Sequence, residues 1–118
     1  MKIYHNSKCS KSRKTLALLK EYSVSHIQII NYLEVPPSFK DLELILIKLE
    51  ISPIELVRTK EEIWKNNYKG QQITDDEIIK VLVENPKLIE RPIVIKGNRA
   101  VIGRPPENVL SLLSQDGI

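Results

Sequence analysis

The sequence predicts an α/β fold, with a mixed four-stranded sheet flanked by helices and a helical insertion in the middle of the chain. Two strand-like runs enclose one helical pattern within the first 32 residues, which is the order of a βαβ unit and implies a parallel pair of strands. After a long helical block, two more strand-like runs are joined by the turn Gly97-Asn98, so they form an antiparallel hairpin. The two kinds of pairing together make the sheet mixed.

The first βαβ unit starts with a short strand at residues 2–4 and continues into a helical pattern over 15–22. Residues 27–32 are rich in β-branched and aromatic side chains, which is typical of a strand. In this first helix, which is predicted to run to about Tyr22, the apolar and aromatic residues Leu16, Leu19 and Tyr22 are spaced at i, i+3 and i+6.

Residues 38–85 are the predicted helical insertion. Pro36-Pro37 forces an extended break before it, and Pro86 cannot continue its last helix. Several helices inside it are predicted to start with Ser or Thr followed three residues later by an acidic residue, the pattern of a capping box. These pairs are Ser38 with Asp41, Ser52 with Glu55, Thr59 with Glu62, and Thr74 with Glu77.

The C-terminal part supplies the hairpin, with strands at 93–95 and 99–102, and a final helix that starts near Pro105-Pro106. Val109, Leu112 and Leu113 are predicted to face the core. The whole order is βαβ, helical insertion, ββα. This is the plan of a thioredoxin-like fold in one domain over residues 1–118, and such a fold places a nucleophile at the N-terminus of its first helix.

Composition narrows the class of protein. A chain of 118 residues with 42% apolar and 28% charged residues fits one soluble globular domain, and no apolar run approaches the length of a membrane span. A single cysteine excludes an intramolecular disulfide, and with no visible signal peptide it favours a cytoplasmic setting. One Cys and two His lack the spacing of metal ligands, so no metal is expected.

The charge is unevenly distributed. Residues 1–20 carry six basic groups and no acidic one, although the net charge of the chain is only +3. Such a cluster suits a small anion or an acidic partner surface. Nucleic acid is a weaker alternative, because few aromatic residues are available for base stacking and no binding motif is present.

Cys9 lies where the first strand meets the first helix. The unpaired N–H groups and the positive end of a helix stabilise a thiolate over a thiol, and the thiolate is the nucleophile. From Asn6 to Lys14 no other residue is apolar, so we expect the thiol to be accessible. A protonated His5 close by would lower the thiol pKa further. The alternative is that Cys9 is a small buried hydrophobe, the commoner fate of a lone cysteine.

Three arginines stand at the predicted ends of elements: Arg58, Arg91 and Arg104. A guanidinium group is well shaped to bind a tetrahedral oxyanion through two hydrogen bonds. The alternative is that each is a solvated surface arginine, as most arginines are. Pro92 directly follows Arg91, and an X-Pro bond before a strand can be cis, although only about 5–6% of such bonds are.

With these residues in view, the sequence resembles the glutaredoxin-coupled arsenate reductase (ArsC) family, and within it the YfgD-like branch. The resemblance covers essentially the whole chain. The matching segments are Ile3-Tyr4-His5-Asn6, Cys9-Ser10-Lys11-Ser12-Arg13, Asn31-Tyr32-Leu33-Glu34 with Pro36-Pro37, Asn85-Pro86-Lys87-Leu88-Ile89-Glu90-Arg91-Pro92-Ile93-Val94, and Ile102-Gly103-Arg104-Pro105-Pro106-Glu107.

The resemblance implies a role for each matching residue. Cys9 matches the nucleophile, and His5 matches the histidine thought to favour its thiolate. Arg58, Arg91 and Arg104 match the arginines that bind the oxyanion, Ser12 and Arg13 fall on the anion loop, and Pro92 matches a cis proline. Ser7 departs from the pattern, because many relatives have proline there.

The expected reaction is arsenate reduction. The Cys9 thiolate would attack arsenate, and because the chain has one cysteine, glutathione and glutaredoxin would supply the further thiols. No bound cofactor is expected. Two alternatives stay open: a general glutathione-dependent thiol reductase, and a non-enzymatic transcription regulator that docks on RNA polymerase. The regulators of the family typically carry Cys-x-x-Cys, whereas this chain has Ser12 at the second position.

Overall fold

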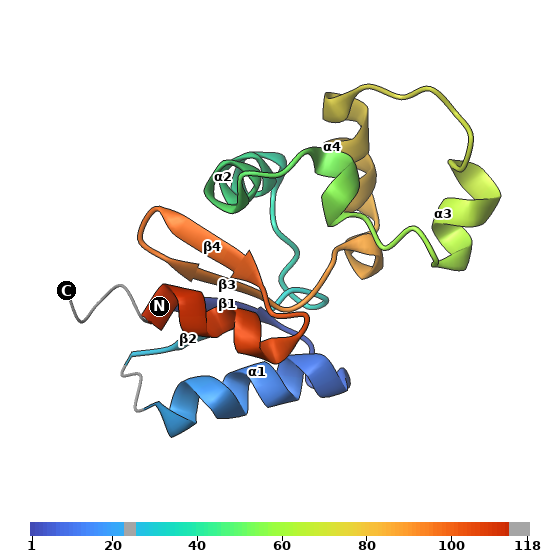
Figure 1. Ribbon diagram of the computed structural model, residues 1–118. Coiled ribbons are helices and arrows are strands. Elements are labelled where there is room, and N and C mark those ends of the chain that lie inside the picture. Colours follow the sequence, from blue (N-terminus) through green and yellow to red (C-terminus); the bar gives the residue numbers. More distant parts are fainter. Residues whose placement is uncertain (23–25, 114–118) are drawn as a thin grey trace. The chain divides into compact units, whose positions relative to one another are not determined.

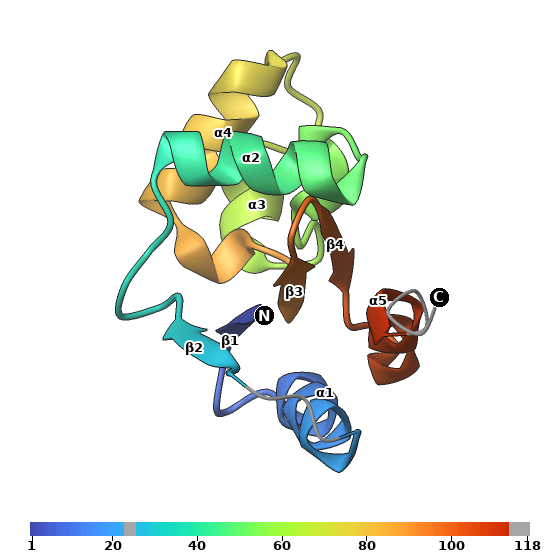
Figure 2. The ribbon, with the colours of Figure 1, turned by 90° about the vertical axis from the view of Figure 1, so that its left-hand side faces the viewer.

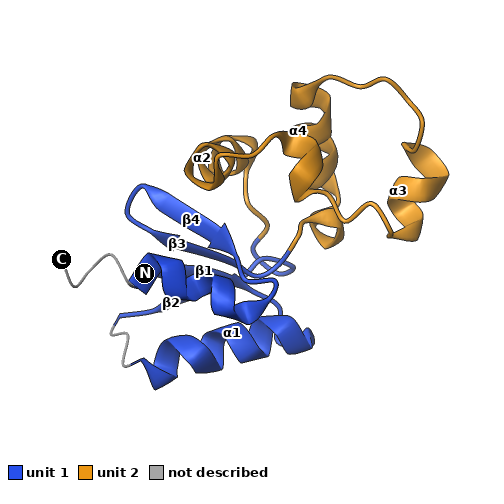
Figure 3. Ribbon diagram, viewed as in Figure 1, with its two compact units in different colours: residues 1–35, 91–118 blue, residues 36–90 orange. Residues whose placement is uncertain are grey.

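The structure is a computed structural model that describes residues 1–22 and 26–113. The chain divides into two compact units, one made of Met1–Val35 and Arg91–Ile118 and the other of Pro36–Glu90 (Figure 3). The predicted insertion, about 38–85, falls within the second unit. The prediction of one domain over 1–118 stays a prediction.

The first unit contains the mixed four-stranded sheet, as predicted. Its strands are β1 (Lys2–His5), β2 (Gln28–Asn31), β3 (Ile93–Lys96) and β4 (Arg99–Ile102), in the spatial order β2-β1-β3-β4. β1 pairs parallel with β2 and antiparallel with β3, and β3 pairs antiparallel with β4. Gly97, in the turn between β3 and β4, has a φ of +59°, a value that favours glycine.

One face of the sheet is covered by α1 (Ser10–Glu21) and by the C-terminal segment, a 3₁₀ turn (Pro106–Val109) followed by α5 (Leu110–Leu113) (Figures 1 and 2). Alternate side chains of a strand point to the same face of a sheet. Ile3 of β1 and Val94 of β3 therefore lie on the face that these helices cover. Tyr22 is 56% exposed, so the inward face of α1 ends at Leu19. The core cluster beneath these elements contains the buried residues Ile3, Leu19, Val94, Val109 and Leu112.

The second unit is helical. It contains α2 (Phe39–Leu49), α3 (Glu62–Asn67) and α4 (Asp75–Glu84), with 3₁₀ turns at Pro53–Leu56 and Pro86–Leu88. α4 packs against α2 and both turns. The core of this unit comes from the apolar stripes of these helices, which include Leu42, Ile45, Leu46, Ile78, Ile79 and Leu82.

Three of the four predicted capping pairs are confirmed. Reciprocal boxes form between Ser38 and Asp41 and between Thr74 and Glu77, and Ser52 with Glu55 starts the first 3₁₀ turn. The fourth, Thr59 with Glu62, was wrong, because α3 has Glu61 as its N-cap. The Glu61 N–H already donates to the carbonyl of Arg58 at 3.1 Å, so a turn precedes the helix and the helix begins at Glu62.

Within residues 1–22 and 26–113, no helix has both the length and the apolar character needed to cross a bilayer.

Candidate active site

Cys9 is the N-cap residue of α1, at the end of a short loop that follows β1. The loop is held by its own backbone: the Cys9 N–H donates to the carbonyl of Asn6 at 3.0 Å, and the Arg13 N–H donates to the carbonyl of Cys9 at 3.0 Å. The Arg13 guanidinium donates to the carbonyl of Ser7 at 2.9 Å. The first turn of α1 carries no acidic side chain, so no negative side-chain charge there offsets the positive end of the helix dipole.

The pKa of the Cys9 thiol is lowered from its ordinary value of 9.0. Burial by itself raises this pKa, but the backbone N–H of Ser12 and the positive charge of Arg91 outweigh burial. The backbone N–H of Lys11 and a hydrogen bond from Arg91 act in the same direction. Because the thiolate is the reactive form, this environment favours Cys9 as a nucleophile.

The expectation of an accessible thiol was wrong, because the Cys9 side chain is largely buried. Cys9 is 8% exposed, and Ser12 of the same polar segment and Thr15 just after it are fully buried. The segment can be buried because its polar groups find local partners. Ser12 bonds to His5 and Asn6, and the Thr15 hydroxyl donates to the carbonyl of Lys11.

His5 contacts Ser12. The His5 Nδ1 lies 2.6 Å from the Ser12 Oγ, which accepts from the Asn6 N–H at 3.0 Å. Burial lowers the pKa of His5 below its ordinary 6.5, and the charges of Arg13 and Lys20 lower it further. The imidazole is therefore mainly neutral at pH 7, and His5 is not among the groups that lower the Cys9 pKa. A protonated His5 beside the thiol, as the sequence suggested, is the minor form at neutral pH.

The guanidinium of Arg91 is the unusual polar group of the site. Its Nε and Nη1 atoms are buried without a hydrogen-bond partner, and they are the only such side-chain atoms among the described residues. Leaving a buried charged donor unpaired is costly. The same guanidinium acts on the Cys9 thiol through its charge.

Pro92 and Arg104 lie in the first unit as well. The Arg91–Pro92 peptide bond is cis, as the resemblance implied, and so is the Arg104–Pro105 bond, which the sequence analysis did not expect. Pro92 is buried, whereas Arg104 and Arg13 are exposed. The oxyanion-binding roles of Arg104 and Arg13 therefore stay predictions.

Arg58 belongs to the second unit, where it is already engaged. Its Nη1 lies 2.8 Å from a carboxylate oxygen of Glu61 and donates to the carbonyl of Lys87 at 3.3 Å. The structure thus brings together Cys9, Ser12, His5 and Arg91 in one unit. The role of Arg58 stays a prediction.

Sequence reasoning missed Thr15 and Gly103. Thr15 carries a hydroxyl on the buried side of α1, and Gly103 directly precedes Arg104. A polar β-branched residue between the apolar positions of a helix is a weak signal, and nothing in the sequence connects it to a glycine so far along the chain.

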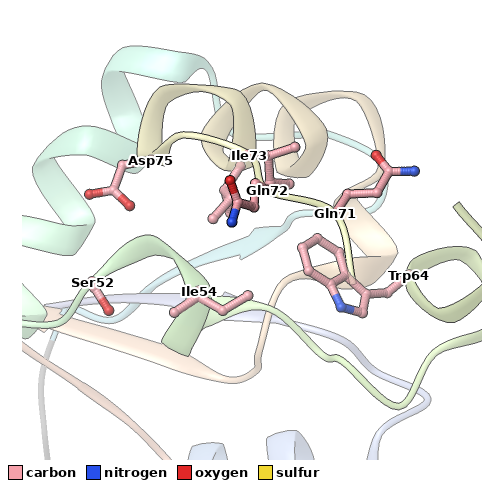
Figure 4. A pocket seen from close by; sticks show the side chains of 8 residues that line it. Ser52, Ile54, Trp64, Gln71, Gln72, Ile73 and Asp75 are labelled. Carbon is pink, nitrogen blue, oxygen red and sulfur yellow. The ribbon is translucent and has the colours of Figure 1, made fainter. Parts of the chain in front are cut away.

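The second unit has a pocket of its own, of about 390 Å³ (Figure 4). Trp64, Ile54 and Ile73 supply apolar lining, and Gln71 and Gln72 supply amides. None of the predicted site residues lines it. Among the described residues, no group of three or more His, Cys, Asp or Glu side chains could hold a metal ion.

A cysteine with a lowered pKa at the N-terminus of the first helix, on a thioredoxin-like sheet, is a candidate thiol-based site. The chain belongs to the ArsC family, whose model matches residues 4–112.

Individual relatives are similar over nearly their whole length. The chain is 46% identical over 113 residues to an arsenate reductase of Haemophilus influenzae, covering 94% of this chain and 97% of that one. It is 45% identical over 115 residues to the protein YfgD of Escherichia coli K12, covering 96% of each. The solved structure of an arsenate reductase from Vibrio cholerae superposes with a TM-score of 0.88 at 45% identity, covering 94% of this chain and 97% of that one. The predicted fold class is confirmed.

Proposed function

We propose that this protein is an arsenate reductase in which the Cys9 thiolate is the nucleophile. The observation that carries the proposal is a thiol of lowered pKa next to the Arg91 guanidinium, whose Nε and Nη1 are buried without a hydrogen-bond partner. A bidentate guanidinium suits a tetrahedral oxyanion, and the positive charge reduces the repulsion between that anion and the thiolate. The names of the similar proteins support arsenate as the oxyanion.

In the first step the Cys9 sulfur attacks arsenic. A sulfur–arsenic bond forms, and one arsenate oxygen takes up protons and leaves as water. Arg91 donates hydrogen bonds to the remaining oxygens, and the N–H groups at the start of α1 face the developing negative charge. The arsenic remains As(V) in this adduct.

The reduction itself requires a second thiol. A thiolate attacks the Cys9 sulfur, the sulfur–arsenic bond breaks, and its electron pair stays on arsenic, which leaves as As(III). The two sulfurs are oxidised to a disulfide. Because the chain has one cysteine, this thiol is external. The family resemblance points to glutathione, with glutaredoxin clearing the mixed disulfide and restoring the Cys9 thiol.

The test is As(III) release from arsenate in the presence of glutathione and glutaredoxin. We expect turnover by the wild type and none above the protein-free rate by Cys9→Ser, because a serine hydroxyl at its ordinary pKa is a poor nucleophile. Ser10→Ala changes the adjacent exposed hydroxyl and serves as the matched control, which should keep the wild-type rate. Equal turnover by wild type and Cys9→Ser would remove Cys9 from the reaction. No turnover by the wild type would reject arsenate as the substrate.

A further inference from the structure

Thr15 and Gly103 form a junction that the proposed reaction does not use. Thr15 lies on the buried side of α1 and is fully buried. Its hydroxyl donates to the carbonyl of Lys11 at 2.9 Å and to the carbonyl of Gly103 at 3.3 Å, so one proton is shared between two carbonyl oxygens. The second contact ties α1 to a residue 88 positions further along the chain.

Gly103 connects this junction to both arginine-bearing segments of the first unit. Its N–H donates to the carbonyl of Pro92 at 2.9 Å. Arg91 directly precedes Pro92, and Arg104 directly follows Gly103. Two hydrogen bonds, of 3.3 Å and 2.9 Å, therefore connect α1, the Arg91 segment and the Arg104 segment.

The space at residue 103 admits no side chain. A Cβ added to Gly103 would lie 2.6 Å from the Thr15 Oγ1 and 3.0 Å from the Pro92 Cγ. The first distance is shorter than real Cβ contacts, so any larger residue would push the three segments apart. Glycine is needed at position 103 because the backbone there lies so close to the side chains of Thr15 and Pro92.

A hydroxyl at this helix position has an energetic cost. Threonine has a lower helix propensity than alanine or leucine, and a hydroxyl that bonds back to the carbonyl four residues earlier slightly destabilises a helix. An apolar side chain would fill a fully buried position without either cost. The hydrogen bond to the Gly103 carbonyl is a reason for a hydroxyl at this position.

We propose that Thr15 and Gly103 are positioning residues, which hold the segments carrying Arg91 and Arg104 at a fixed distance from the Cys9 end of α1. Lys11, whose carbonyl accepts from Thr15, also supplies one of the N–H groups that lower the Cys9 pKa. The inference rests on the proposed function, because an oxyanion bound by Arg91 must lie within bonding reach of the Cys9 sulfur.

The first experiment compares Thr15→Ala, which removes the hydroxyl, with Thr15→Ser, which keeps it. Thr15→Ala should raise the KM for arsenate about tenfold with a smaller change in kcat, because the guanidinium is misplaced relative to the sulfur. It should also raise the Cys9 pKa by about half a unit, because the Arg91 charge is less well held. Thr15→Ser should remain close to wild type in both quantities.

The second experiment uses Gly103→Ala alone and combined with Thr15→Ala. The single variant should raise the Cys9 pKa and the arsenate KM. The double variant should recover part of both, because the shortest contact of the new Cβ, at 2.6 Å, is with the Thr15 Oγ1. Should Gly103→Ala fail to fold, the comparison of Thr15→Ala with Thr15→Ser still tests the positioning role.

A lower melting temperature of Thr15→Ala with unchanged Cys9 pKa and KM would overturn the inference, since that result describes a purely structural contact. Absence of recovery in a folded double variant would also contradict it. The Cys9 pKa is measured without arsenate. If the wild type does not reduce arsenate, the proposed function fails, but the comparison of thiol pKa values still tests the positioning role.

Discussion

The hydroxyl of Ser12 links His5 to the loop that precedes Cys9. Because the Ser12 Oγ accepts from the Asn6 N–H, its own proton is available to the Nδ1 of a neutral His5 at 2.6 Å. Protonation would convert Nδ1 into a donor and remove this acceptor. His5 therefore supports the site through the shape of the loop rather than through its charge.

This arrangement predicts a pH dependence of stability. Since the folded pKa of His5 lies below the ordinary 6.5, its contribution is fully present above pH 6.5 and is lost as pH falls from there toward the folded pKa. The unfolding free energy of the wild type, measured by urea between about pH 7.5 and pH 5.5, should fall with pH. His5→Asn should flatten this dependence.

His26→Asn is the matched control, because His26 is the other histidine of the chain and is exposed. It should keep the wild-type dependence. An equal slope in wild type and His5→Asn would show that His5 does not produce the effect.

At this scale the sequence predicted the position of Cys9 but not its burial. The strand and helix patterns place Cys9 at a helix N-terminus whatever its neighbours do. Its burial depends on partners for Ser12 and Thr15, and one of those, the carbonyl of Gly103, comes from a distant part of the chain. Local polarity could not reveal this, because a buried polar group is acceptable once it is hydrogen-bonded.

The contacts made by the first residues of a helix determine where the helices of the second unit begin. α4 begins with a reciprocal box in which the Thr74 Oγ1 accepts from the Glu77 N–H at 3.2 Å and the Thr74 N–H donates to the Glu77 carboxylate at 3.2 Å. α3 begins differently, after a turn closed by Arg58 and Glu61. A Ser/Thr-x-x-Glu pattern forms a capping box only where the helix begins directly after the Ser or Thr, and α3 begins two residues later, after Glu61.

The two starts predict opposite outcomes for the same substitution. Thr74→Ala should lower the unfolding free energy by about 1 kcal/mol, because it removes a formed cap. Thr59→Ala should change it by less than about 0.5 kcal/mol, the usual range for a surface site. Urea unfolding of both variants measures the difference, and an equal loss in both would contradict the assignment of Glu61 as the N-cap of α3.

Across the whole molecule, the predicted site residues are divided between the two units. Cys9, Arg91 and Arg104 belong to the first, and Arg58 belongs to the second. The fold class could be predicted because the order of strands and helices fixes a mixed sheet. The assembly of the site could not, since it depends on contacts such as that of Thr15 with Gly103, which no periodicity encodes.

Because Arg58 lies in the second unit, its substitution tests whether a residue of that unit binds the oxyanion. If Arg58 binds the oxyanion, Arg58→Ala should raise the KM for arsenate about tenfold or more, because a charge-assisted hydrogen bond to the substrate is lost. Glu61→Gln breaks the same ion pair but keeps the guanidinium, so it should not raise the KM. An unchanged KM in Arg58→Ala would confine the oxyanion site to residues of the first unit.

The central claim is that the helix N-terminus and Arg91 lower the pKa of the Cys9 thiol. The direct measurement is the rate of Cys9 alkylation as a function of pH in wild type, Arg91→Ala and the control Arg99→Ala, whose guanidinium donates to the carbonyl of Ser111. The wild-type inflection should lie below the ordinary thiol pKa of 9.0, Arg99→Ala should match it, and Arg91→Ala should move it upward. An inflection at or above 9.0 in the wild type, or no shift in Arg91→Ala, would contradict the claim.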